Sequence, residues 1–192
     1  MVSGAVALPA AQRGALMIEV LVTIVICVIG LWGLTEVQVR LQLSEVESYQ
    51  RSQALMLLED MSTRLELNRI HAADYVTGSS SPLGTGTSCS TNTGTLAQRD
   101  LGEWCNLLQG VAESAGGSTR VGAMLGARGC IENIGTNRYM LTVAWQGMSP
   151  LVAPPSSVAC GADAYDTSGT ACTGDLCRRA VTTVVRIGNL SS

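Results

Sequence analysis

The sequence has no Phe, no Lys and a single His, and aromatic residues make up only 4% of its 192 residues. So few aromatic side chains exclude a large aromatic core. Charged residues are also scarce, at 14%, which excludes disorder of the highly charged kind. The formal net charge of −3 excludes the basic surface on which nucleic-acid binding depends. The length allows one ordinary domain, or a small domain with an appendage.

The scarcity of histidine bears on catalysis and on metal binding. Nucleophilic triads generally need a His, and the single His71 lies at the end of a predicted helix, where an exposed or capping side chain is typical. No C-x-x-C pair occurs, which argues against structural zinc and thioredoxin-like chemistry. Asp163 and Asp166 lie in a Gly- and Thr-rich loop and are interpreted as turn formers. Residues 121–129 lack the G-K-[ST] of a phosphate loop. We therefore expect no enzyme activity, metal or cofactor.

Residues 15–34 form a long apolar run, ALMIEVLVTIVICVIGLWGL, with Glu19 as its only charge. About twenty apolar residues span a bilayer as an α-helix. A secretory signal peptide would have a shorter apolar core and a small-residue cleavage site after it. Here TEVQVRLQ follows instead, without an A-x-A motif. We therefore predict a retained transmembrane helix.

The helix is predicted to continue beyond the apolar run, because residues 34–75 contain neither Gly nor Pro. A helix from about residue 15 to about residue 72 would be roughly 85 Å long. Three acid–arginine pairs at i,i+4 spacing each contribute roughly 0.2–0.5 kcal/mol: Glu36–Arg40, Glu47–Arg51 and Asp60–Arg64. The apolar residues that recur at helical spacing, and that must pack against something, are Ala54, Leu58, Met61, Leu65 and Ala72.

Residues 73–192 have a different composition, rich in Gly, Ser, Thr and Cys. After a turn-forming stretch at 78–95, residues 95–114 show helical periodicity, and Gly116-Gly117 would end that helix. Residues 138–146 and 178–187 alternate between apolar and polar side chains, which predicts two strands. A long irregular loop with three prolines and three cysteines lies between these strands, and loops of that length are usually functional or pinned. The apolar stripe of the 95–114 helix is Leu101, Trp104, Leu108 and Val111.

The seven cysteines divide by location. Cys27 lies in the apolar run and is interpreted as a small hydrophobe that faces lipid or a neighbouring helix. The other six favour three disulfides in an oxidising compartment. Six cysteines allow 15 connectivities, and the sequence does not choose among them. These six are Cys89, Cys105, Cys130, Cys160, Cys172 and Cys177.

The junction before the apolar run carries the functional hypothesis. An ionisable group in a membrane segment costs about 2.5–3.5 kcal/mol when central, so Glu19 is a functional candidate by default. Gly14-Ala15-Leu16-Met17-Ile18-Glu19 resembles the class III signal of type IV prepilins, in which Gly precedes apolar residues with Glu at the fifth position. In that family a membrane peptidase cuts after the Gly on the cytoplasmic side and methylates the new N-terminal residue. The resemblance implies cleavage between Gly14 and Ala15, N-methylation of Ala15, and neutralisation of its ammonium by Glu19 of the same or an adjacent subunit.

The resemblance continues along the chain and narrows the family to the PilV-type minor pilins, the type IV pilus modification proteins. The first part is IEVLVTIVICVIGLWGL, including Gly30 and Gly33, and the second is RSQALMLLEDMSTRLELNR at 51–69. Residues 139–147 and 177–187 look like the late strands of that family. The family usually has Phe or Met at the first mature position, where this chain has Ala15.

The resemblance implies an α+β, type IV pilin-like lollipop. A long N-terminal helix would pack on a small antiparallel β-sheet head with disulfide-stapled loops. The expected parts are a prepilin leader at 1–14, a transmembrane and filament-core helix at 15–34, an amphipathic continuation at 35–72 and a periplasmic globular head at 73–192.

The same resemblance implies a minor pilin that helps to initiate and assemble type IV pili. It would join other minor pilins in a priming complex that can remain at the pilus tip, and would support adhesion or twitching motility. The expected partners are prepilin peptidase, other minor pilins, the major pilin, inner-membrane lipid and the inner-membrane assembly platform, and no nucleic acid. The chain would cross the inner membrane once, with the head in the periplasm, and could enter extracellular pili.

Other functions stay open at this point. A minor pseudopilin of a type II secretion system shares the junction and the long helix, although the six-cysteine head and the late strands favour the pilus. A different class is a membrane-anchored periplasmic adhesin or enzyme. An anchored adhesin would need no Gly14–Glu19 junction, and an enzyme with a nucleophilic triad would need a better-placed His.

Overall fold

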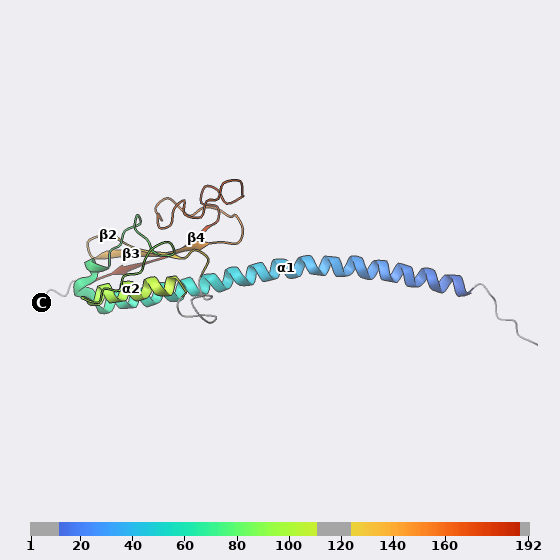
Figure 1. Ribbon diagram of the computed structural model, residues 1–192, viewed down its shortest axis with the longest axis horizontal. Helices are drawn as coiled ribbons and strands as arrows, with labels where there is room; N and C mark the ends of the chain where they lie inside the picture. Colours follow the sequence, from blue (N-terminus) through green and yellow to red (C-terminus); the bar gives the residue numbers. More distant parts are fainter. Residues whose placement is uncertain (1–11, 111–123, 189–192) are drawn as a thin grey trace, which may run out of the picture. The chain divides into compact units, whose positions relative to one another are not determined.

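The computed structural model describes the backbone of residues 12–110 and 124–188, and the side chains in those ranges from Met17 onward. The chain divides into two compact units, Met1–Glu45 and Val46–Ser192. In chain order the elements are α1 (Gln12–Leu67), the 3-10 helix η1 (Arg69–Tyr75), β1 (Leu83–Gly84), α2 (Leu96–Leu108), β2 (Arg128–Gly135), β3 (Arg138–Gln146) and β4 (Arg178–Arg186) (Figure 1). A long apolar N-terminal helix and a small antiparallel sheet make the α+β class.

Helix α1 has 56 residues and belongs to both units. It begins at Gln12, three residues before the predicted start, and ends at Leu67 rather than near Ala72. Residues 69–75 instead form η1, which contains a non-helical residue at His71 (φ −110°, ψ 25°). The Asn68 side chain donates to the Tyr75 hydroxyl (3.1 Å), which ties the residue after α1 to the last residue of η1.

The described strands form a four-stranded antiparallel sheet in the order β1-β2-β3-β4, so each strand pairs with its neighbour in the sequence. The predicted strand at 138–146 is confirmed as β3, and the one at 178–187 is confirmed as β4 to within one residue. The strands β1 and β2 are not predicted by the sequence pattern. In β2 three successive residues, Gly129, Cys130 and Ile131, are buried, which removes the alternation that reveals a strand.

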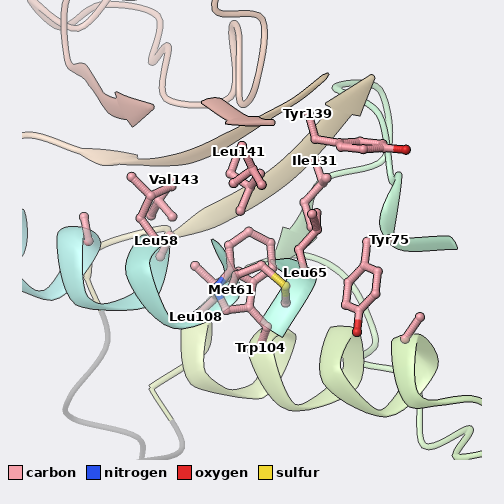
Figure 2. Packing of buried hydrophobic residues seen from close by; sticks show 14 of the residues in the cluster. Leu58, Met61, Leu65, Tyr75, Trp104, Leu108, Ile131, Tyr139, Leu141 and Val143 are labelled. Carbon is pink, nitrogen blue, oxygen red and sulfur yellow. The ribbon is translucent and has the colours of Figure 1, made fainter. Parts of the chain in front are cut away.

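The core of the Val46–Ser192 unit lies between the sheet and two helices (Figure 2). The predicted stripe of α1 is confirmed, since Ala54, Leu58, Met61, Leu65 and Ala72 are all buried. Helix α2 and the sheet cover this stripe with Trp104, Leu108, Ile131, Leu141 and Val143. The buried indole N–H of Trp104 has a hydrogen-bond partner, because Nε1 donates to the Leu57 carbonyl of α1 (2.9 Å).

The absence of a side chain at Gly129 leaves room for the Trp104 ring. A Cβ added at Gly129 would overlap the Trp104 ring and would lie 2.7 Å from Leu108 Cδ1. The residue at this point of β2 must therefore lack a side chain, because α2 crosses the sheet here with its largest side chain inward. The glycine that weakened the strand signal in the sequence is the residue that lets α2 pack.

Helix α2 is shorter than the sequence predicts. Thr95 caps its N-terminus through a capping box, with Gln98 N donating to Thr95 Oγ1 and Thr95 N donating to Gln98 Oε1, both at 3.2 Å. The helix ends at Leu108, and Gly110 follows with φ 78°, which is typical of a helix C-terminus. Val111 and Gly116-Gly117, which were expected in and after the helix, lie outside the described residues.

Two of the three predicted i,i+4 pairs form, namely Glu36–Arg40 (2.7 Å) and Asp60–Arg64 (3.0 Å). The predicted pair of Glu47 with Arg51 is wrong. Glu47 instead accepts from Arg179 Nε of β4 at 2.6 Å. Arg51 is exposed on α1. The Arg179 guanidinium is half-buried and also donates to the carbonyls of Ser149 (2.7 Å) and Leu176 (3.2 Å). These bonds hold the charge of Arg179 in a fixed position beside Glu47.

The six head cysteines form three disulfides, as predicted, and the structure supplies their pairing: Cys89–Cys105, Cys130–Cys160 and Cys172–Cys177. The second of these ties the long loop at 147–177 to β2. Buried Arg178 supports the same loop, because its guanidinium donates to the carbonyls of Val158 (2.6 Å) and Cys160 (3.1 Å). The loop is thus pinned, as its length led us to expect.

Removal of each disulfide as a pair of Cys→Ser substitutions is expected to destabilise the head in the order of loop length. The bridges close separations of 30, 16 and 5 residues. The chain-entropy relation gives losses of about 3.6 kcal/mol for Cys130–Cys160, about 3.1 kcal/mol for Cys89–Cys105 and about 2.1 kcal/mol for Cys172–Cys177. Urea unfolding followed by near-ultraviolet circular dichroism measures these losses. A largest loss at the Cys172–Cys177 pair would contradict the expectation.

Candidate functional site

The first candidate site is the apolar surface of α1. Every residue from Met17 to Val46 is exposed, although most of them are apolar. An 18-residue window of this helix reaches a mean hydropathy of 2.5, and none of that window is buried within the protein, so by length and composition the helix can cross a membrane. An exposed apolar surface of this size marks contact with lipid or with another protein. Its large apolar side chains include Ile18, Leu21, Ile24, Val28, Leu31 and Leu34.

Glu19 lies on this surface as an exposed carboxylate. Gly14 and Ala15 belong to the first turns of α1, whose side chains lie outside the described part, as do residues 1–11 of the predicted leader. The helix is continuous from Gln12, so the peptide bond between Gly14 and Ala15 is helical in the uncleaved chain. Residues 15 and 19 are separated by four positions, and positions with that spacing are neighbours on one face of a helix.

Gly30 and Gly33 lie on the same side of α1 as Glu19. At 100° per residue they are within about 40° of the Glu19 direction. A Cβ added at either glycine would meet nothing within 4 Å. Packing within the chain therefore does not require these glycines, and they leave a flat strip on which a second helix could approach closely.

Cys27 is a free, exposed cysteine on the same helix. Its exposure among apolar side chains agrees with the interpretation of a small hydrophobe at a lipid or helix contact.

In the Val46–Ser192 unit the most charged cluster surrounds Arg64 of α1. Its guanidinium contacts Asp60 (3.0 Å) and, from α2, Asp100 (3.1 Å) and Glu103 (2.6 Å). Burial alone lowers the pKa of Arg64, but hydrogen bonds to the three carboxylates outweigh it and raise the pKa above its ordinary value. Of these three partners only Asp60 is predicted by the sequence, because the other two lie 36 and 39 residues away.

Tyr75 extends this cluster into the core. Its hydroxyl donates to Asp100 Oδ2 at 2.5 Å and accepts from Asn68 Nδ2 at 3.1 Å. Burial, together with the hydrogen bond to Asp100, raises the pKa of Tyr75 to about 12. The cluster joins α1, η1 and α2 and satisfies buried polar groups, so its role is to fix the two helices on each other.

The raised pKa of Tyr75 predicts a loss of stability in alkali. The folded-state pKa lies above the unfolded value of 10.0, so the contribution is fully present below pH 10 and is lost as pH rises toward 12. Between pH 9 and 12, the free energy of unfolding of Tyr75→Phe should fall less steeply than that of the unchanged protein. Urea unfolding at each pH measures the slope, with Tyr49→Phe on the exposed side of α1 as the control. Equal slopes for Tyr75→Phe and the unchanged protein would contradict the assignment.

The residues weighed for catalysis are not assembled into a site. His71 is exposed, with Nδ1 3.5 Å from an Asp74 carboxylate oxygen. Asp166 accepts from the backbone N–H groups of Gly174 (2.8 Å) and Asp175 (2.9 Å), and Asp163 has φ 58°, so both serve turns as expected. Within residues 12–110 and 124–188, no three His, Cys, Asp or Glu side chains gather as a metal site.

The comparisons with known proteins do not identify the chain. No protein-family model matches it, and neither a curated protein nor a solved structure does. The function of the chain is therefore inferred from its own residues and their arrangement.

Proposed function

We propose that this chain is a minor pilin of a type IV pilus, which helps to prime and assemble the filament through packing of its α1 with the α1 helices of other subunits. The observation that carries the proposal is the exposed carboxylate of Glu19, the only charged side chain in the apolar and uncovered part of α1 at 17–34. A helix that served only as an anchor would gain from an apolar residue at that position, because a charge in lipid is costly.

The proposed cleavage between Gly14 and Ala15 would provide a partner for the Glu19 carboxylate. Cleavage after Gly14 would create an ammonium group on Ala15 in an apolar environment. Because α1 continues through both positions, Glu19 lies one helical turn from that ammonium, and it can also meet the ammonium of an adjacent subunit. Pairing lowers the cost of both charges, so it favours one register between neighbouring helices.

The glycine strip and the head support the same function. An added Cβ at Gly30 or Gly33 would meet nothing within 4 Å, so this strip of α1 can admit a neighbouring α1. The three disulfides suit an oxidising compartment, which agrees with a head in the periplasm and an anchor in the inner membrane. In this proposal the partners are prepilin peptidase, other minor pilins, the major pilin, the assembly platform and inner-membrane lipid.

Processing is the first test of the proposal. In cells with an active prepilin peptidase, the membrane-extracted protein should lack residues 1–14 and carry a methylated N-terminal Ala15. Intact-mass spectrometry measures both changes. The Gly14→Val variant, whose junction the peptidase should not cut, is the matched control and should keep its leader. A protein that still begins at Met1 in cells that process other prepilins would refute the proposal.

A minor pseudopilin of a secretion system would be processed in the same way. Deletion of the gene separates the two functions, since loss of pili with normal secretion supports the pilus. Loss of secretion with normal pili would replace the proposal with the pseudopilin.

A further inference from the structure

A cleft of about 380 Å³ lies on the head and is lined by the turn at 79–82, by Arg128 and by the 159–164 part of the long loop. Arg128, at the start of β2, lines the cleft. The rest of the lining is small or hydroxylated: Ser79, Ser80, Pro82, Ala159, Gly161, Ala162 and Ala164. The volume falls within the range of small-molecule sites.

Among the arginines whose side chains the structure describes, Arg128 differs from the others that are at least partly buried. Arg64, Arg178 and Arg179 each form an ion pair with a carboxylate. Arg128 forms none within the described residues. Its Nη1 donates to the Gly126 carbonyl (3.2 Å), and its guanidinium carbon lies 5.1 Å from the centre of the Tyr165 ring. Its charge is held in place but not neutralised.

Tyr165 fixes the position of the Arg128 guanidinium. The ring is buried, and its hydroxyl donates to the same Gly126 carbonyl at 2.9 Å. Gly126 (φ 65°) and Gly161 (φ 68°) have left-handed backbone conformations, and a Cβ on either would approach the Tyr165 ring at 3.0 or 3.3 Å. Both glycines therefore allow the ring to lie under Arg128.

The turn at 79–82 contributes neutral polar groups to the lining of the cleft. Within the part of the chain that the structure describes, the hydroxyls of Ser79 and Ser80 make no hydrogen bond. The Cys130–Cys160 disulfide anchors the 159–164 wall to the sheet, so the cleft does not depend on a loose loop. Alanine and proline side chains complete the walls and form small apolar surfaces.

We propose that this cleft binds an acidic monosaccharide, of the uronic acid class, as a free sugar or as a residue of a longer glycan. One uncompensated guanidinium suits a single carboxylate. Two free hydroxyls suit the hydroxyl groups of a sugar, and the alanine and proline surfaces suit the C–H face of its ring. A phosphate would call for more than one cation or for a cluster of backbone N–H groups. The inference does not rest on the pilin assignment, since it concerns the head alone.

Isothermal titration of the full-length protein in detergent micelles at low salt tests the proposal. The probes are glucuronic acid, glucose, acetate and inorganic phosphate. Glucuronic acid should bind, and each of the other three should bind at least about tenfold more weakly, because each lacks either the charge or the hydroxylated ring. Arg128→Gln should weaken glucuronic acid binding about tenfold or more, while Arg138→Gln, an exposed arginine outside the cleft, should leave it unchanged.

Ala162→Trp provides a variant that leaves Arg128 and Tyr165 intact, since Ala162 is exposed and a large side chain there should fill the cleft. It should abolish binding with an unchanged circular dichroism spectrum, so the test remains decisive if Arg128→Gln does not fold. Absence of glucuronic acid binding would overturn the proposal. If acetate or phosphate bound as tightly as glucuronic acid, the cleft would be a general anion site. If glucose bound as tightly as glucuronic acid, Arg128 would have no role in recognition. Either result would also overturn the proposal.

Discussion

Replacement of Glu19 with valine should reduce surface piliation at least about tenfold, while the protein still inserts into the membrane at its normal level. Valine is apolar and fits the surrounding surface of α1, so insertion should not suffer. Under the proposed function assembly should suffer, because the ammonium that cleavage would create on Ala15 would lose its carboxylate. An ion pair out of water that loses one partner costs about 3–5 kcal/mol, which exceeds the roughly 1.4 kcal/mol that corresponds to a tenfold change in an equilibrium.

The experiment counts pili by electron microscopy and measures the membrane-bound protein by immunoblot. Glu36→Val is the matched control, because Glu36 is an exposed glutamate of the same helix that lies beyond the apolar run and pairs with Arg40 on the surface. It should leave piliation unchanged. Glu19→Asp keeps the charge on a shorter side chain and should give an intermediate result. Normal piliation in Glu19→Val, with processing intact, would refute the pairing of Glu19 with the N-terminal ammonium.

The regular parts of this fold could be predicted because they follow from local patterns. Leu58, Met61 and Leu65 repeat at the helical period and are buried. Tyr139, Leu141, Val143 and Trp145 alternate along β3 and are buried as well. In α1 the helical period marks the face that packs against the core. In β3 the four residues share one face, but Thr142 and Ala144 on the opposite face are buried as well, so burial does not alternate along this strand.

The parts that the sequence did not predict depend on contacts between distant residues. The association of Arg64 with Asp100 and Glu103 is determined only when α2 docks on α1. The bridges Cys89–Cys105 and Cys130–Cys160 likewise depend on which segments meet in the fold. The expected Glu47–Arg51 pair was wrong for the same reason, since Arg179 lies 132 residues from Glu47. Local spacing says which residues can pair on an isolated helix, and tertiary packing decides which of them do.

The candidate site divides in the same way. Glu19 was found from the sequence because a carboxylate interrupts an apolar run, and such an interruption is visible in one dimension. The cleft beside Arg128 was not found. Its walls come from residues near 80, 128 and 160, and Arg128 is distinguished only by the absence of a carboxylate partner among the described residues. The cleft therefore becomes visible only in three dimensions.

The largest loss of stability is expected from Trp104→Ala. Trp104 is 0% exposed, packs between α1 and the sheet, and donates its indole N–H to the Leu57 carbonyl. Substitution of a buried Trp by Ala costs about 3–5 kcal/mol, and here an acceptor on α1 also loses its donor. Urea unfolding followed by near-ultraviolet circular dichroism measures the loss. Trp32→Ala is the matched control, because Trp32 is 79% exposed on α1 and its removal should change the free energy of unfolding by less than about 0.5 kcal/mol.

A double-mutant cycle with Gly129 tests the packing argument itself. Gly129→Ala alone should destabilise the head by about 1–3 kcal/mol, because the new methyl group overlaps the Trp104 ring. Gly188→Ala, where an added Cβ meets nothing within 4 Å, should have little effect. In the Trp104→Ala background the methyl group gains space, so Gly129→Ala should cost far less than it does alone, which the cycle reports as a coupling of the two sites. Additive losses would show that Trp104 and Gly129 do not compete for the same volume, and would contradict the reason given for a glycine in β2.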